Sequence, residues 1–156
     1  MSDTLYDRDI LLWSEQQAET LQRLADGERV NDAIDWPHLI DEVLDVGRSQ
    51  FNSVQSLLEQ ALVHLLKLRL WPDDPAADHW RSEAAAFLSG ATRRFSPSMR
   101  QRIEVPELFG DAVRQLRNGG FILETDAICS AACPYAIDDL LSNRTVAELA
   151  ALLPIV

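Results

Sequence analysis

Cysteine is scarce in this sequence, which limits the kinds of fold and site the chain can build. The 156 residues include two cysteines, Cys129 and Cys133, in a CxxxC spacing. This number is too small for a disulfide-stapled fold, and no CxxC pair or nearby histidine completes a zinc set. We therefore expect both thiols to be reduced and packed.

Long apolar runs are also missing. No stretch reaches the ~18 uncharged apolar residues that a membrane-spanning helix needs. The opening residues, MSDTLYDRDILLW, place no basic region before an apolar segment, so they do not resemble a signal peptide. We expect a cytoplasmic protein with no membrane partner.

Basic residues are outnumbered by acidic ones. The chain has 14 Lys and Arg against 25 Asp and Glu, a net charge of -11. Residues 1–47 hold 12 acidic and 3 basic residues, whereas residues 48–103 hold 5 and 8. Such a chain repels phosphate backbones, so nucleic-acid binding needs a local basic patch. The only basic cluster is formed by four arginines: Arg93, Arg94, Arg100 and Arg102. We expect them to pair with acids of residues 1–47, within one chain or across a dimer.

Helical periodicity dominates what is present. A first helix is predicted from about Leu5 to Asp26, with Asp3 or Thr4 as its cap and Gly27 as its stop. The second helix begins after Asp35 and continues to about Pro72. At 100° per residue its apolar side chains stay in one arc of roughly 140° over some 30 residues, or ~45 Å. These are Leu39, Ile40, Val43, Leu44, Gly47, Phe51, Val54, Leu57, Leu58, Ala61, Leu62, Leu65 and Leu68.

Gly47 lies in the centre of this apolar stripe. A glycine inside a helix costs ~1 kcal/mol relative to alanine, so a compensating contact is expected. We predict that another helix packs closely there; a kink that divides the helix is the alternative.

Further helices are predicted after residue 75, after Ser96, over 104–118, and in two short segments, 135–141 and 145–153. Residues 119–134 are left unassigned, because "FIL" suits a short strand but no partner strand is evident. The fold class is all-α: a helical bundle built around one long central helix (about 37–71), with short C-terminal helices, in a single domain, 1–156.

Candidate site residues lie mainly on the second helix. Asp41, Glu42 and Asp45 favour a solvated acidic face. His38 and Glu42 lie on adjacent turns, as metal ligands do in helical bundles, but no third ligand is visible. His64 borders the apolar stripe, where a structural histidine is the commoner outcome.

Glu42 and His64 are the candidates for a catalytic acid–base pair. They share a flank of the predicted helix but are 22 residues, or ~33 Å, apart along it. Only an antiparallel dimer crossing near Ser53 would bring them together, so separate partners are the expected outcome. No phosphate-loop, hydrolase or metalloprotease motif is present, and no cofactor is expected.

Six stretches follow one another along the chain: YDRDILLW, IDWPHLIDEVLDVGRSQ, LLEQALVHLLKLRLWP, HWR, SPSMR and CPYAIDDLL. Together they resemble the bacterial family called domain of unknown function 29 (DUF29). The chain departs from the family pattern at His38, where Asn is usual, and at Leu68, where Trp is usual. The resemblance implies a compact, mostly helical, soluble bacterial protein, and it supplies no catalytic residue.

Three functions remain open. The first is a protein–protein interaction module that self-associates as a homodimer, which an exposed apolar patch would support. The second is an enzyme with a small polar or metal site on the second helix, which a pocket at Glu42 or His64 would support. The third is nucleic-acid binding through the four arginines, which a contiguous arginine face would support.

Overall fold

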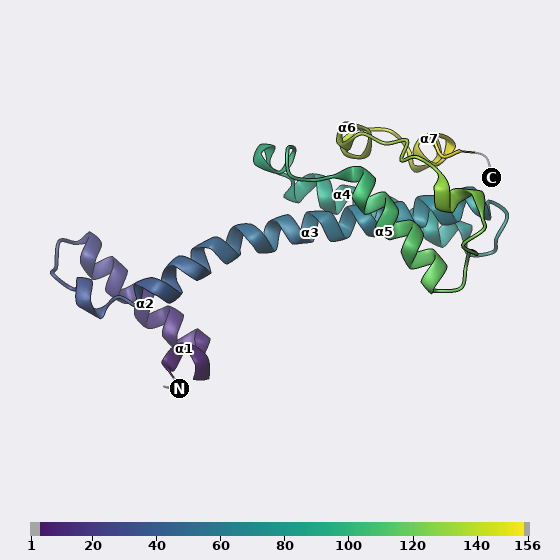
Figure 1. The fold of residues 1–156 in the computed structure, drawn as a ribbon. Coiled ribbons are helices and arrows are strands. Elements are labelled where there is room, and N and C mark those ends of the chain that lie inside the picture. Colours follow the sequence, from purple (N-terminus) through teal and green to yellow (C-terminus); the bar gives the residue numbers. More distant parts are fainter. Residues whose placement is uncertain (1–3, 155–156) are drawn as a thin grey trace. The chain divides into compact units, whose positions relative to one another are not determined.

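The protein is almost entirely helical (Figure 1). The computed structural model describes residues 4–154, and no strand occurs among them. The elements are α1 (Leu5–Arg8), α2 (Ile10–Ala25), η1 (Asn31–Ala33), α3 (Trp36–Leu70), α4 (Ala77–Arg94), η2 (Pro97–Met99), α5 (Val105–Asn118), η3 (Ala127–Ser130), α6 (Ile137–Leu141) and α7 (Val146–Ala151). The predicted all-α fold with one long helix and short C-terminal helices is therefore confirmed.

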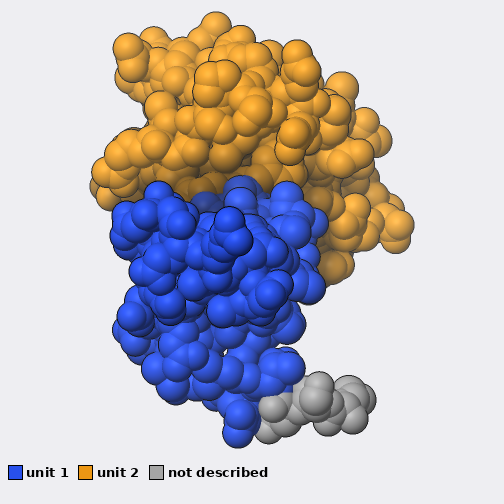
Figure 2. Space-filling model, turned by 90° about the vertical axis from the view of Figure 1, so that its left-hand side faces the viewer, with its two compact units in different colours: residues 1–49 blue, residues 50–156 orange. Residues whose placement is uncertain are grey.

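The chain forms two compact units, shown in different colours in Figure 2. Unit 1 is Met1–Ser49 and unit 2 is Gln50–Val156. That the whole chain behaves as one domain stays a prediction. No helix in the described part of the chain combines the length and apolarity needed to cross a membrane.

Unit 1 contains α1, α2, η1 and the first part of α3. The prediction of one helix from Leu5 to Asp26 was wrong at Asp9, where the backbone leaves the helical region and α2 starts anew. The Asp9 carboxylate accepts a hydrogen bond from the amide of Leu12 at 3.0 Å, so it caps α2. The predicted cap Thr4 begins α1 instead, in a capping box with Asp7. Asp3, the other predicted cap, lies outside the described residues.

The helix α3 runs from Trp36 to Leu70 without a break, as predicted to within one residue at each end. Gly47 is helical like its neighbours, so it does not divide the helix. The predicted close packing at Gly47 was wrong within the described chain, because no atom lies within 4 Å of a Cβ built at this position. The central position of a residue in an apolar stripe does not establish that something covers it.

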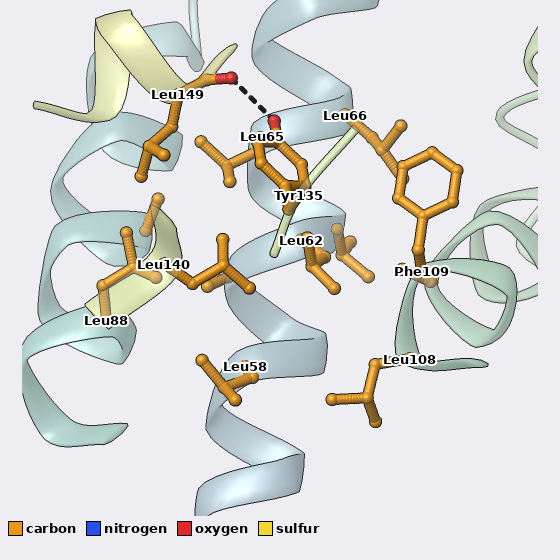
Figure 3. Packing of buried hydrophobic residues seen from close by; sticks show 14 of the residues in the cluster. Leu58, Leu62, Leu65, Leu66, Leu88, Leu108, Phe109, Tyr135, Leu140 and Leu149 are labelled. Atoms are coloured by element: carbon orange, nitrogen blue, oxygen red, sulfur yellow. Dashed lines mark hydrogen bonds between the residues drawn. The ribbon is translucent and has the colours of Figure 1, made fainter. Parts of the chain in front are cut away.

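Unit 2 is built on the C-terminal part of α3, which lies between α4 and α5 (Figure 3). Leu58, Leu62 and Leu65 are fully buried there, and each such side chain stabilises the fold by ~1.5–3 kcal/mol relative to an exposed one. Tyr135 belongs to the same core, and its hydroxyl donates a hydrogen bond to the carbonyl of Leu149 at 2.7 Å.

The segment 119–134, unassigned from the sequence, follows a sharp turn. Gly120 has a φ of +78°, a conformation that favours glycine, and ends the path of α5. The "FIL" stretch forms bends and irregular backbone rather than a strand. Cys129 and Cys133 are free thiols and partly buried, and burial raises the pKa of Cys133.

Candidate functional site

The polar and aromatic side chains that gather in unit 1 come from three helices. Tyr6 lies on α1 and Trp13 on α2, whereas His38 and Glu42 lie one turn apart on α3. The ring of Tyr6 stacks on the imidazole of His38, with centroids 4.0 Å apart and planes 16° apart. The edge of Trp13 approaches Tyr6 at 4.9 Å between centroids. These contacts attach α1 and α2 to the first turns of α3.

Asp35, which precedes α3, is the polar centre of this cluster. One of its carboxylate oxygens accepts hydrogen bonds from Nδ1 of His38 at 2.7 Å and from Nε1 of Trp13 at 3.1 Å. Its backbone amide donates to the side-chain oxygen of Gln17 at 2.7 Å. The hydrogen bond from His38 is the main cause that lowers the pKa of Asp35. Asp35 therefore fixes the orientation of the imidazole as well as the start of α3.

Glu42 has a single defined partner in this cluster. Its Oε1 accepts a hydrogen bond from the hydroxyl of Tyr6 at 2.6 Å. That hydrogen bond, followed by desolvation and by the charge of Glu42, raises the pKa of Tyr6 to about 12. Glu42 also lines a groove of about 430 Å³ between α2 and α3, whose other walls are mostly apolar. The arrangement holds a neutral phenol against a carboxylate.

The proposed metal pair does not acquire a third ligand. His38 is bound to Asp35 and Glu42 to Tyr6, and among residues 4–154 no group of three His, Cys, Asp or Glu side chains is placed to hold a metal ion. Of the other acids singled out from the sequence, Asp41 is exposed and Asp45 pairs with Arg48 at 3.0 Å.

His64, the other catalytic candidate, belongs to unit 2 and has its own partners. Its Nδ1 donates to the backbone carbonyl of Gln60 at 2.8 Å. Its Nε2 lies 3.3 Å from a carboxylate oxygen of Glu83 on α4, and its ring packs near Phe87. Glu42 and His64 are thus each bound within a different unit, the first by α1 and the second by α3 and α4.

The four arginines of the basic cluster lie in unit 2 and differ in their surroundings. Arg100 pairs with Asp138 of α6, not with an acid of residues 1–47, and its guanidinium lies 5.5 Å from the ring centre of Phe95. Arg93, Arg94 and Arg102 are exposed and have no ion pair in the described part of the chain. Pairing of these three with the acidic segment stays a prediction.

A second feature of unit 1 is apolar surface that no element of the described chain covers. Eight large hydrophobic residues of α2 and α3 are exposed there: Ile10, Leu11, Leu12, Trp36, Ile40, Val43, Leu44 and Val46. Trp13 and Ile34 are the buried hydrophobic residues among those described in this unit. Unit 1 therefore buries far less of its apolar surface than unit 2 does.

Sequence reasoning missed the role of Tyr6 and used Asp35 only to mark the start of the second helix. Neither residue belongs to a known catalytic spacing, and their contacts join segments 22 to 36 positions apart. The one available signal was the stretch YDRDILLW, which carries Tyr6 and belongs to the family-like set.

Comparison with known proteins places the chain in a family. The model of the family described as "Domain of unknown function DUF29" matches residues 5–145, so the chain belongs to it. A solved structure, that of an alpha-helical protein of unknown function from Rhodospirillum rubrum ATCC 11170, shares the fold with a TM-score of 0.70 and 24% identity. The match covers 97% of this chain and 99% of that one. No curated protein matches.

Proposed function

We propose that this member of the DUF29 family is a protein-interaction module that self-associates through the uncovered apolar face of α3. One observation supports the proposal above the others. The stripe that forms the core of unit 2 continues in phase into unit 1, where none of residues 4–154 covers it. Leu58 and Leu62 are fully buried, whereas Ile40 and Val43, on the same face, are 56% and 66% exposed.

The exposed apolar side chains of unit 1 lie on two helices, α2 and α3. On the stripe of α3 itself Ile40, Val43 and Leu44 are 56%, 66% and 49% exposed, so an interface centred on this stripe would also include surface around it. A standard protein–protein interface buries roughly 800 Å² per partner. Monomeric proteins rarely leave a contiguous apolar patch larger than a few hundred Å². A binding partner for this face is therefore expected.

A second copy of the chain suits this face, because the stripe is self-complementary. In a two-fold dimer each helix would present the same residues to the other, as closed symmetry requires. Such a dimer would explain the glycine at position 47, since its missing side chain lets the two helices approach closely there. In an antiparallel pair centred on Gly47, Glu42 would lie opposite Asn52. This dimer therefore does not unite Glu42 with His64.

The decisive experiment is a charge placed in the stripe. Val43→Asp should convert a dimer into a monomer, because it would bury an unpaired carboxylate in the interface. Sedimentation velocity at several concentrations measures the change. Leu123→Asp, at an apolar residue of unit 2 that is 70% exposed, is the matched control and should leave the mass unchanged. The proposal is contradicted if the wild-type chain stays monomeric at a concentration on the order of 100 micromolar. It is also contradicted if the Val43→Asp variant still forms the dimer.

The enzymatic alternative has one observation in its favour: Asp35 orients His38 as a carboxylate orients a catalytic histidine. All the contacts of this cluster, however, also serve to hold the helices of unit 1 together.

A cytoplasmic location is part of our proposal. It is supported by the two free thiols, because secreted proteins tend to oxidise theirs.

A further inference from the structure

A groove in unit 2, independent of the dimer face, has the features of a small-molecule site. It lies between α4 and the segment that joins α6 to α7, and its volume is about 580 Å³. Ligand pockets in proteins span roughly 300–1,000 Å³. The groove is thus large enough for a molecule of modest size.

The charge around this groove is opposite to that of the chain. Arg81, Arg93 and Arg144 line it, and no Asp or Glu does, although acids outnumber basic residues 25 to 14 in the sequence. Arg81 pairs with Asp78, and Arg144 with Asp139 at 3.3 Å. Arg93 has no ion pair among residues 4–154. One positive charge therefore faces the groove uncompensated.

The floor of the groove is apolar and buried. Leu88 and Leu140 line it and are also buried members of the core of unit 2 (Figure 3). Ala85, Leu141 and Val146 extend the same surface. The remaining wall carries five uncharged polar side chains: Ser89 and Thr92 of α4, and Ser142, Asn143 and Thr145. A ligand would therefore meet one cationic end and one apolar end.

We propose that this groove binds a monocarboxylate with an aliphatic body of about eight to twelve carbons. The guanidinium of Arg93 would receive the carboxylate through paired N–H···O bonds. The aliphatic chain would lie over the leucine floor, where each buried CH₂ adds to affinity. A phosphate dianion suits the groove less well, because its second charge would have to draw Arg81 or Arg144 away from its acidic partner.

Titration calorimetry of the full chain with decanoate tests this proposal. Wild-type protein should bind decanoate, and octanoate about tenfold more weakly, since two CH₂ groups are lost. Arg93→Gln should weaken decanoate binding by tenfold or more, as expected for loss of a charged hydrogen bond. Ala85→Trp, at an exposed position that lines the groove, should block it sterically while leaving the helical circular dichroism unchanged.

The control is Arg102→Gln, since Arg102 is exposed, without an ion pair in the described residues, and outside the groove. It should bind decanoate like the wild type. Val43→Asp should do so too, which separates this site from the apolar face of unit 1. Equal affinity of the Arg93 and Arg102 variants, equal affinity for 1-decanol, no measurable binding, or displacement by millimolar inorganic phosphate would each overturn the proposal.

Discussion

Tyr6 in unit 1 makes two kinds of contact, one through its ring and one through its hydroxyl. Its ring stacks on His38 while its hydroxyl donates to Glu42. The stack fixes where α1 meets α3, and the hydrogen bond fixes the protonation state of the phenol. A tyrosine that keeps its proton to about pH 12 cannot serve as a base near neutral pH. We therefore interpret the cluster as structural: its contacts hold α1 and α2 against the start of α3.

Removing the charge of Glu42 tests this interpretation at the residue scale. In Glu42→Ala the pKa of Tyr6 should fall from about 12 towards the ordinary value of ~10, because the variant lacks both the hydrogen-bond acceptor that is the main cause of the shift and the carboxylate charge. Ultraviolet absorbance titration measures the pKa of Tyr6. The other tyrosine, Tyr135, is not expected to ionise near pH 10 in either protein, because burial raises its pKa. Unchanged ionisation of one tyrosine per chain near pH 10 in both proteins would contradict the assignment.

The same shift gives stability a defined pH dependence. Because the pKa of Tyr6 is higher in the folded state, its contribution is fully present below ~pH 10, the unfolded value. It is then lost as the pH rises towards about 12. Tyr6→Phe should therefore remove this part of the alkaline loss of stability.

At the scale of elements, α3 is one helix with two environments. Its period and its flanking residues predicted both ends, because Asp35 and Pro72 act locally. The same pattern could not distinguish the buried half from the bare half, since coverage depends on helices that are distant in sequence. The break at Asp9 was missed for a different reason: an aspartate within a helical pattern is also compatible with a solvated face.

Gly47 provides a test in which folding and association change in opposite directions. Gly47→Ala should stabilise the dissociated chain by ~0.5–1 kcal/mol, because alanine favours an exposed helix and nothing lies nearby to clash. The same methyl group should weaken the proposed dimer by separating the crossing helices. Urea unfolding at low protein concentration measures the first effect and sedimentation equilibrium the second. A lower urea midpoint for the variant would show that Gly47 is packed after all.

At the scale of the whole molecule, charge distribution decides how association responds to salt. Residues 1–47 hold 12 acidic and 3 basic residues, so a dimer formed by two copies of unit 1 brings like charges together. Adding salt should strengthen this dimer, since the Debye length falls from about 10 Å at 0.1 M to 3 Å at 1 M. Sedimentation at both salt concentrations measures the change.

A dimer held by arginine–acid pairs would respond in the opposite way and weaken with salt. Arg100 has its partner in α6, which leaves Arg93, Arg94 and Arg102 for such a contact. The sign of the salt effect therefore separates the two interfaces. A matched variant, Arg94→Gln, should leave the apolar dimer unaffected and weaken the arginine-held one.

The in-phase stripe of α3 also bears on how this helix is free to evolve. Substitutions at Leu58 or Leu62 disturb the folding of their own chain, whereas substitutions at Ile40 or Val43 cost an isolated chain little, since these side chains already face water. Selection on the second pair would then act through the partner alone. Among relatives, the two halves of a single helix should diverge at different rates, and residues 36–47 should covary with one another across the two-fold axis of the proposed dimer.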